Sequence, residues 1–209
     1  AEGRRTGLYT SPELVDLAER YRVDGRPLDR ELLDACAERV GEASAEVDAT
    51  FFEAAAALAF LAFREAGVEW AVAEVGLGGR LDATSVLEPE VSMITSVARD
   101  HQRFLGEELP EIAREKAGIL RAGVPAALGR MPSEALEVVE ARAREVGAPL
   151  RRLGRQARIE DVEVDARGTR FVYVSEARPG GLRLSVPLPG VHQAENAAVA
   201  LMALEALDV

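Results

Sequence analysis

The spacing of apolar residues along the chain predicts helices in some segments and strands in others. Four segments carry apolar side chains at the three- and four-residue spacing of a helix face, and the second is apolar on nearly every side, which predicts a buried helix. They are residues 28–42, 51–66, 111–120 and 133–146. Three short apolar runs are typical of buried strands. They are residues 68–75, 90–97 and 124–128.

The order of these segments predicts the fold class. Strands and helices alternate as far as residue 154, which is typical of an α/β fold with a mainly parallel sheet flanked by helices. Residues 155–189 follow another pattern, because turn-forming Gly and Pro separate short strands there. We expect this segment to form a small antiparallel sheet that packs beside the main sheet and carries no catalytic residue. Residues 190–209 are expected to form a final helix that starts near Gln193.

Composition narrows the classes of function. The chain has 25 basic and 36 acidic side chains, a net charge of −11, and so acidic a surface repels the phosphate backbone of nucleic acids. Cys36 is the single cysteine, which excludes a disulfide within the chain and fits a reducing compartment. No apolar stretch reaches membrane length, and no signal peptide is visible. We therefore expect a cytoplasmic protein that binds neither nucleic acid nor a membrane.

The glycine-rich run that begins at Gly76 does not match a phosphate-binding motif. It follows a predicted strand, but the third glycine of a dinucleotide-binding loop would stand at position 81, which is Leu81. The chain has no Walker A sequence either. By sequence alone, this chain therefore carries no phosphate loop.

Polar residues follow two successive predicted strands. Glu74 lies at the end of the first, and Asp100 and His101 follow the second. The carboxyl ends of parallel strands form the edge of a sheet at which ligands bind. A carboxylate and an imidazole on that edge suit a divalent cation that keeps water and phosphate as its other ligands. The alternatives are an ion pair between Glu74 and Arg80 and a histidine with a structural hydrogen bond.

Three further polar residues have ordinary explanations when they are considered alone. Lys116 stands in a predicted helix, where a lysine is usually solvated. His192 and Asn196 lie near the start of the final helix, and helix starts are commonly polar. An amide side chain such as that of Asn196 can also pair with the edge of an adenine ring.

Several motifs follow one another along the chain. They are residues 7–12, 19–20, 22–25, 50–53, 74–84, 100–101, 104–106 and 112–119, followed by Gly190, His192, Gln193 and Asn196. In order and spacing they resemble the folylpolyglutamate and dihydrofolate synthases of the Mur ligase superfamily. The resemblance implies that residues 1–209 are the incomplete central ATP-binding and catalytic domain, with a fold like that of P-loop NTPases. A phosphate loop is then expected before residue 1, and a C-terminal domain after residue 209.

The resemblance also implies a role for particular residues. Glu74 and His101 would bind the metal, and His101 together with Lys116, as a carbamate, would act in catalysis. The folate-side pocket would contain Thr50, Phe52 and Asp82. His192 and Asn196 would contact ATP. Four residues at three sites depart from the family pattern. Glu13 stands where the family usually has His, Ala98-Arg99 where Gly-Leu usually precedes Asp-His, and Ser85 where Asn is frequent.

The implied reaction is amide ligation by a monomer that uses ATP and Mg²⁺. ATP phosphorylates a carboxylate of a folate or dihydropteroate, and the amine of L-glutamate then attacks the acyl phosphate. One alternative is a ligase of the same superfamily with another carboxylate substrate, such as a peptidoglycan precursor. The other is an inactive fragment or homologue. The 209 residues alone are expected to be inactive.

Overall fold

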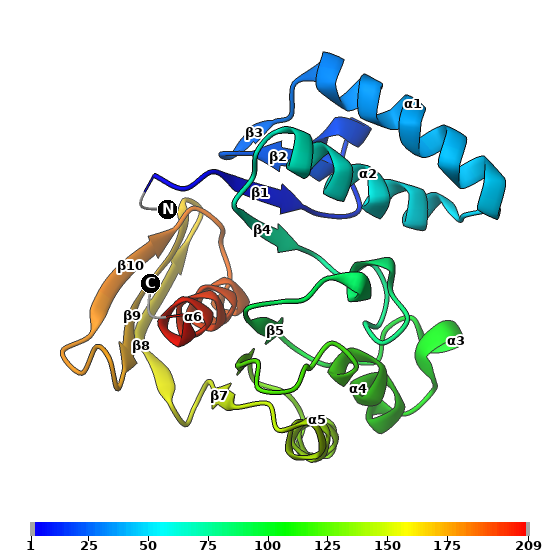
Figure 1. Ribbon diagram of the computed structural model, residues 1–209. Helices are drawn as coiled ribbons and strands as arrows, with labels where there is room; N and C mark the ends of the chain where they lie inside the picture. Colours follow the sequence, from blue (N-terminus) through cyan, green and yellow to red (C-terminus); the bar gives the residue numbers. More distant parts are fainter. Residues whose placement is uncertain (1–2, 208–209) are drawn as a thin grey trace. The chain divides into compact units, whose positions relative to one another are not determined.

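The computed structural model describes residues 3–207, which fold into two compact units divided between Leu87 and Glu88 (Figure 1). The first unit contains one sheet and two long helices, and the second contains two sheets and four helices among the described residues. Each unit has hydrophobic core residues of its own.

A four-stranded mixed sheet organises the first unit. Its strands are β1 (Thr6–Tyr9), β2 (Tyr21–Val23), β3 (Arg26–Pro27) and β4 (Trp70–Ala73), in the spatial order β3-β2-β1-β4. A loop with one turn of 3-10 helix, η1 (Leu17–Arg20), returns the chain so that β2 pairs antiparallel with β1. β4 pairs parallel with β1 on its other side. Among the described residues β4 is an edge strand, and Val72 is 52% exposed.

Two helices connect β3 to β4. The carboxylate of Asp29 caps the start of α1 (Arg30–Val47) by accepting a hydrogen bond from the Leu32 N–H. Cys36 faces the core of this unit as a buried packing residue. Helix α2 (Phe51–Glu65) buries a face made largely of alanine, but Phe51 is 63% exposed. The prediction that this helix is buried on nearly every side is therefore wrong for its first turn.

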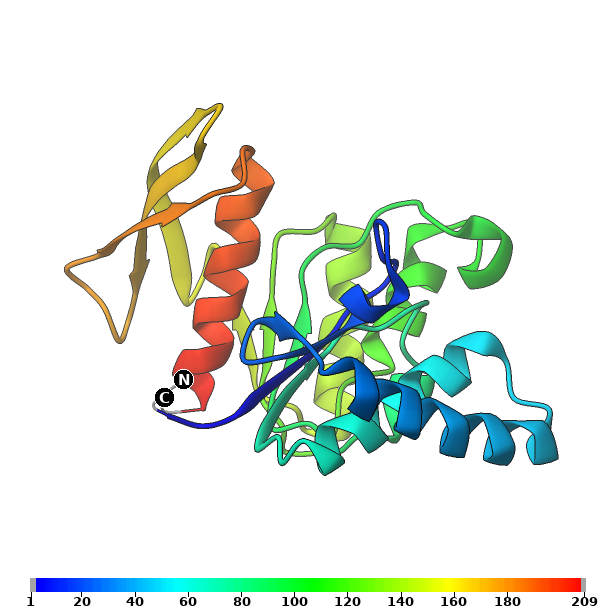
Figure 2. The same ribbon diagram turned by 90° about the horizontal axis from the view of Figure 1, so that it is seen from above.

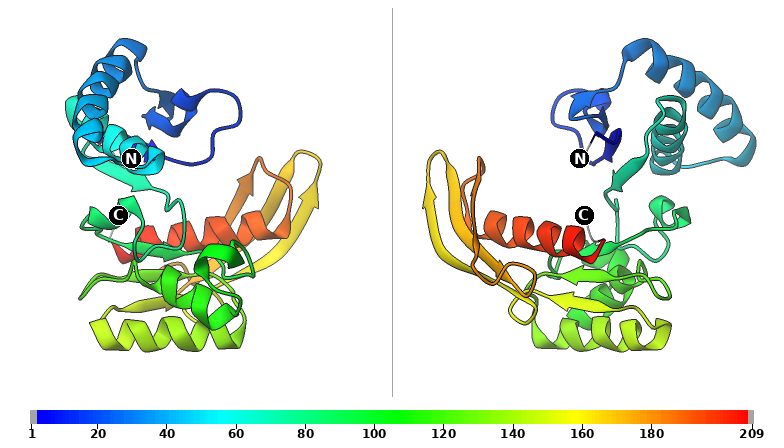
Figure 3. Two further views of the ribbon diagram at one scale, coloured as in Figure 1. Left: turned by 90° about the vertical axis from the view of Figure 1, so that its right-hand side faces the viewer. Right: turned by 60° about the vertical axis from the view of Figure 1, so that its left-hand side comes forward.

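The second unit contains a three-stranded parallel sheet. Its strands are β5 (Ser92–Ile94), β6 (Ala126–Leu128) and β7 (Leu150–Arg152), with β6 in the centre. The helices between them are α3 (Gln102–Leu105), α4 (Leu109–Ala117) and α5 (Ser133–Val146). Strand side chains alternate between the two faces. Ala126 and Leu128 accordingly pack with α4 and α5, whereas Ala127 packs with the last helix, α6 (Val191–Ala206). Figure 3 shows α5 and α6 on opposite sides of this sheet.

An antiparallel sheet lies on the other side of α6 (Figure 2). Its strands are β8 (Ala157–Asp165), β9 (Gly168–Ser175) and β10 (Leu182–Val186), in the order β10-β9-β8. Phe171 and Tyr173 of β9 pack with Ala198 and Met202 of α6. Helix α6 therefore lies between the parallel and the antiparallel sheets of the second unit.

The structure confirms the fold class and the antiparallel sheet predicted for residues 155–189. It differs from the prediction in distributing the parallel strands over two sheets, with β1 and β4 in one and β5, β6 and β7 in the other. The strand predicted at 90–97 is confined to Ser92–Ile94, and α6 begins at Val191 because Gly190 is its N-cap. Among the residues described, no helix combines the length and apolar character needed to cross a membrane.

Candidate functional site

Glu74 lies where β4 ends, beside the end of β1. Because these two strands are parallel, their carboxyl ends lie at the same edge of the sheet. The backbone N–H of Ser11 donates a hydrogen bond to Glu74 Oε2 at 2.8 Å, and the Glu74 N–H donates to the Tyr9 carbonyl. The carboxylate is exposed and is held at this edge by the backbone of β1. At the opposite end of β4, the exposed Glu69 accepts the N–H of Arg5 in the same way, at 3.0 Å.

The loop after Glu74 is organised by the buried carboxylate of Asp82. Oδ2 accepts the N–H groups of Gly76 and Leu77 at 3.1 and 3.0 Å. Oδ1 accepts the N–H and the hydroxyl of Thr84 at 2.9 and 2.6 Å. The hydrogen bond from the Thr84 N–H also makes Asp82 the N-cap of the short helix η2 (Ala83–Val86). A carboxylate offers about four acceptor positions, and four donors of the loop occupy them here. Contact of Asp82 with a substrate stays a prediction.

Thr50 begins α2 through a reciprocal capping box. Its hydroxyl accepts the N–H of Glu53 at 3.3 Å, and the Glu53 carboxylate accepts both the N–H and the hydroxyl of Thr50, at 2.8 and 2.6 Å. The hydrogen bonds from the Thr50 hydroxyl and N–H lower the pKa of Glu53. This contribution to stability is therefore present above the unfolded-state pKa and is lost as the pH falls through the lower folded-state pKa.

Thr50→Ala is expected to destabilise the polypeptide by about 1 kcal/mol, because the substitution removes the N-cap acceptor and half of the capping box. Urea unfolding at neutral pH measures the change. Thr95→Ala, at an exposed position outside any helix, is the matched control and is expected to change stability by less than about 0.5 kcal/mol. Equal stabilities of the two variants would contradict the assignment.

Phe52 contributes to an aromatic cluster beneath the Gly76 loop. Its ring centroid lies 6.2 Å from that of Tyr9, which stacks on Tyr21 at 5.9 Å. A Cβ atom at Gly76 would lie 2.2 Å from Phe52 Cζ, so the ring lies directly against the backbone of the loop. The structure thus brings together Phe52, the Gly76 loop and the Asp82 carboxylate that holds this loop.

Arg20, for which the sequence analysis assigned no role, borders the same cluster. Its guanidinium is 5.4 Å from the centre of the exposed Phe51 ring and forms an ion pair with Glu13. A hydrogen bond from the backbone of Glu13 and the ion pair with Arg20 hold the pKa of the Glu13 carboxyl below its usual value. The departure from the family pattern at position 13 therefore supplies a partner for this buried arginine.

Two tyrosine hydroxyls lie next to Arg20. Among the described residues, neither the Tyr9 nor the Tyr21 hydroxyl has a hydrogen-bond partner by geometry, although both side chains are fully buried. Burial raises the pKa of Tyr21 to about 12, and burial likewise raises the pKa of Tyr9. Both phenols therefore stay neutral at physiological pH.

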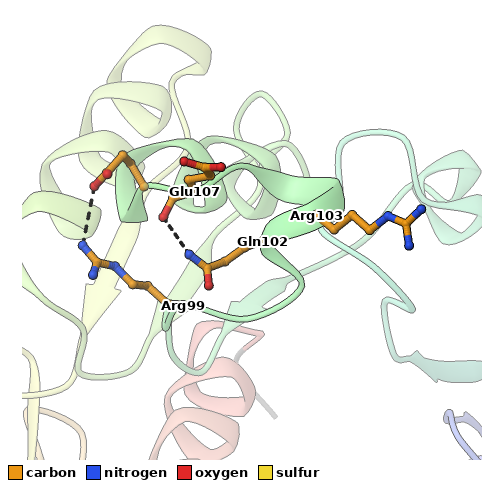
Figure 4. A pocket seen from close by; sticks show the side chains of 5 residues that line it. Arg99, Gln102, Arg103 and Glu107 are labelled. Atoms are coloured by element: carbon orange, nitrogen blue, oxygen red, sulfur yellow. Dashed lines mark hydrogen bonds and ion pairs between the residues drawn. The ribbon is translucent and has the colours of Figure 1, made fainter.

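In the second unit, His101 follows the loop after β5 and has a left-handed backbone, with φ 51° and ψ 32°. The Asp100 carboxylate supports this conformation by accepting the His101 N–H at 2.7 Å. A surface hollow of about 320 Å³ lies beside it, lined by Arg99, Gln102, Arg103, Glu107 and Glu108. In the hollow, Gln102 donates to the Glu107 carbonyl at 3.0 Å (Figure 4), and Arg99 pairs with Glu108 at 3.5 Å. The basic and acidic side chains that line the hollow largely balance in charge.

Lys116 is the next-to-last residue of α4 and is half-buried. Among the 25 lysine and arginine side chains of the chain it is the only lysine. A single lysine in a chain that otherwise uses arginine indicates a position that requires an amine. A guanidinium cannot replace an amine that must lose its proton, so this feature of the sequence could have identified Lys116. Helix α4 contacts α3, which follows His101 directly.

His192 and Asn196 lie on one exposed face of α6, because residues four apart lie one above the other on a helix. Gly190, the N-cap of α6, has φ +132°, and a Cβ there would lie 2.4 Å from His192 Cε1. Only glycine adopts this backbone conformation without strain, and only glycine leaves room for the imidazole. The helix start therefore fixes the imidazole at the beginning of the polar face.

Comparison with known proteins decides the family. Residues 31–204 match the family model of the Mur ligase middle domain. The chain belongs to the Mur ligase family. The folylpolyglutamate synthase of Lacticaseibacillus casei is 38% identical over 209 residues, 96% of this chain and 48% of that protein. The dihydrofolate synthase/folylpolyglutamate synthase of Escherichia coli (strain K12) is 39% identical over 208 residues, 99% of this chain and 46% of that protein.

A solved complex of a folylpolyglutamate synthase with AMPPCP and folate agrees with these relatives. It matches with a TM-score of 0.89 and 35% identity, over 98% of this chain and 51% of that one. The resemblance inferred from the motifs is thus confirmed, and this chain corresponds to a central part of such synthases. The chain spans about half the length of these two curated relatives.

The predicted site residues of this Mur ligase middle domain are divided between the two units. Thr50, Phe52, Glu74 and Asp82 belong to the first unit, and His101, Lys116, His192 and Asn196 belong to the second. Within residues 3–207, no three His, Cys, Asp or Glu side chains gather closely enough to form a metal site of their own. That Glu74 and His101 approach one ion stays a prediction.

Proposed function

We propose that this chain is the central part of an ATP-dependent ligase that joins L-glutamate to a folate or a dihydropteroate. The observation that carries the proposal is the loop between Glu74 and Thr84, fixed by Asp82 at the carboxyl end of a parallel strand. Ligands of open α/β sheets bind at this edge. The match to a synthase bound to AMPPCP and folate supports the choice of substrates.

The donor groups fit a magnesium ion held by few protein ligands. Mg²⁺ commonly binds one or two carboxylates and keeps water and substrate phosphate in its other positions, so a cluster of three protein side chains is not required. Glu74 offers an exposed carboxylate whose orientation is fixed by the Ser11 N–H, and His101 offers an exposed imidazole. When bound, the ion would neutralise charge on the transferring phosphoryl group.

The remaining residues bind and position the substrates in this proposal. The pterin ring lies near Phe52 and the start of α2 at Thr50, on the loop that Asp82 holds. The adenosine part of ATP lies on the polar face of α6, where Asn196 pairs with the adenine edge and His192 lies near the ribose. Binding of both substrates in fixed orientations would favour attack of the carboxylate on the γ-phosphate.

The reaction would proceed in two displacements. A carboxylate oxygen of the folate attacks the γ-phosphorus, the bond to the β,γ-bridging oxygen breaks, and ADP leaves. The neutral amine of glutamate then attacks the acyl carbon. The tetrahedral intermediate expels inorganic phosphate, and the amine nitrogen loses its proton as the amide forms.

The test is a ligation assay with the full-length polypeptide that contains these residues. With ATP, Mg²⁺ and L-glutamate, we expect mass spectrometry to detect a glutamylated product from dihydropteroate or tetrahydrofolate, with one ADP released per amide. Turnover of nucleotide-linked muramyl substrates alone would favour a peptidoglycan-precursor ligase instead. Absence of turnover with every carboxylate, in a folded protein that binds ATP, would favour an inactive homologue.

We expect Lys116 to carry a carbamate in the intact enzyme. The neutral amine attacks CO₂ and loses a proton, which replaces an ammonium by a group with two oxygens and a negative charge that hard cations favour. Because Lys116 is the only lysine in these 209 residues, ¹³C-bicarbonate gives a carbamate NMR signal that is assigned by its loss in Lys116→Arg.

The same substitution tests the contribution of Lys116 to catalysis. Arginine keeps the positive charge but cannot be carbamylated, so Lys116→Arg is expected to lower kcat by about a hundredfold. Arg114→Lys on the same helix is the control, because it supplies an amine at an exposed position. Undiminished activity of Lys116→Arg would show that neither the lysine nor its carbamate contributes to catalysis.

A further inference from the structure

Strand β9 of the antiparallel sheet forms side-chain hydrogen bonds at both ends of α6. Residues 169, 171, 173 and 175 lie on one face of that strand, and all four are buried. At the end of α6, the Tyr173 and Ser175 hydroxyls donate to the Glu205 carboxylate at 2.9 and 2.8 Å. At its start, Thr169 contacts the segment that leads into the helix.

The Thr169 hydroxyl has three backbone groups within hydrogen-bonding distance. The Thr169 side chain is completely buried, and its hydroxyl lies 2.8 Å from the Leu188 carbonyl and 3.1 Å from that of Gly190. The Gly190 N–H donates back to the same hydroxyl at 3.0 Å. One hydroxyl thus holds the backbone of residues 188–190, because it donates to one of two carbonyls while it accepts from an amide.

The preceding residue brings this hydroxyl close to the segment. Gly168 has φ +148°, and a Cβ there would lie 2.1 Å from the Val186 carbonyl oxygen. β9 therefore begins in close backbone contact with the end of β10, and Thr169 pairs in register with Val186. This close approach places the Thr169 hydroxyl opposite the turn that ends at Gly190.

The segment held by Thr169 sets the direction in which α6 presents its polar face. The Gly190 carbonyl accepts the Gln193 N–H at 2.9 Å and so forms the first turn of the helix. The His192 ring lies against Gly190, and Asn196 follows one turn later. A displacement of residues 188–190 would therefore move both side chains together.

We propose that Thr169 is a positioning residue for nucleotide binding, which it serves without touching the nucleotide, by fixing the start of α6. This inference rests on the proposed function, in which His192 and Asn196 contact ATP. The hydroxyl itself is buried against the protein backbone and has no access to a ligand. Its effect on ATP passes through the Gly190 turn.

The experiment uses Thr169→Val in the full-length polypeptide, because valine keeps the shape of threonine and lacks only the hydroxyl. Calorimetric titration with AMPPCP and Mg²⁺ is expected to give a Kd about five- to tenfold higher, the effect of weakening one or two hydrogen bonds to the nucleotide. In turnover the KM for ATP is expected to rise by more than kcat falls. Thr169→Ser, which restores the hydroxyl, is expected to recover the affinity to within about twofold.

Tyr173→Phe is the matched control. It removes a buried hydroxyl from the same strand and loosens the opposite end of α6, so it lowers stability without displacing Gly190. Its Kd for AMPPCP is expected to stay within about twofold of the parent value. Hydrogen exchange supplies a second readout, since Thr169→Val is expected to lose protection at the Gly190 amide and Tyr173→Phe is not.

Two results would overturn the inference. One is a parent-like Kd in Thr169→Val, and the other is an equal loss of affinity in Thr169→Val and Tyr173→Phe, which would indicate a general loss of stability. Failure of the proposed function is detected by a different variant. An Asn196→Ala protein with parent-like AMPPCP affinity would contradict the assigned nucleotide contact, whatever the result for Thr169.

Discussion

Glu74→Gln in the full-length enzyme is expected to lower kcat roughly a hundredfold, with a much smaller effect on stability. The glutamine carbonyl can still accept the hydrogen bond that Ser11 donates at 2.8 Å, so the connection between β1 and β4 is retained. What the substitution removes is the negative charge that would bind the cation in the proposed function. Stabilisation of charge in the transition state accounts for effects of this size. Steady-state kinetics at saturating ATP and folate measure it.

The opposite end of the same strand provides the control. Glu69 is exposed and accepts a backbone N–H from Arg5 at 3.0 Å, as Glu74 does from Ser11. Glu69→Gln therefore removes one negative charge and leaves a carbonyl that can accept the same hydrogen bond. We expect kcat to change by less than about twofold in Glu69→Gln, because this carboxylate lies at the edge of the sheet opposite the proposed metal site. Equal losses in the two variants, or full activity in Glu74→Gln, would contradict the role of Glu74 as a metal ligand.

Asp82→Asn is expected to destabilise the polypeptide by about 3 kcal/mol, a large fraction of the stability of a typical domain. All four donors to this carboxylate come from the loop it organises. An asparagine has one oxygen and an amide nitrogen, so at least one pair of donors would face another donor in a buried position. Urea unfolding followed by tryptophan fluorescence reports the loss, since Trp70 lies in β4 directly before this loop.

Asp34→Asn is the comparison for this change. Asp34 forms an ion pair with Arg30 across one turn of α1, and both side chains are largely exposed. Exposed pairs of this kind contribute little, so a change below about 0.5 kcal/mol is expected. If Asp82→Asn were as mild as Asp34→Asn, the loop would not depend on the carboxylate for its conformation. Asp82 would then be free to bind a substrate directly.

The sequence predicted the second unit better than the first. Helix α5 was predicted with its observed bounds, 133–146, because its apolar positions repeat with a regular helical period. Strands β1, β2 and β3 were not predicted, since they are two to four residues long and much of their stability comes from pairing with one another and with β4. Helix α3 was missed for a related reason, as four residues are too few to show a period.

In the candidate site, too, features set by neighbouring residues could be predicted, and contacts between residues distant in the sequence could not. Residues 50–53 stood out by family resemblance alone, although the spacing of Thr50 and Glu53 before an apolar helix also matches a capping box. Glu74 was correctly placed at the end of a strand. Its bond to Ser11 joins residues 63 positions apart, and no local pattern encodes such a contact. The pairing of Arg20 with Glu13 likewise depends on how the η1 loop folds back.

The parallel pairing of β1 with β4 has a consequence for synthesis on the ribosome. β1 is synthesised before its parallel partner β4 (Trp70–Ala73), and both long helices lie between the two strands in the sequence. Loop closure over such a distance must precede any gain from the pairing, so the first unit cannot complete its core until the nascent chain has emerged past β4. Until then, the antiparallel sheet of β1, β2 and β3 has an unpaired edge at β1.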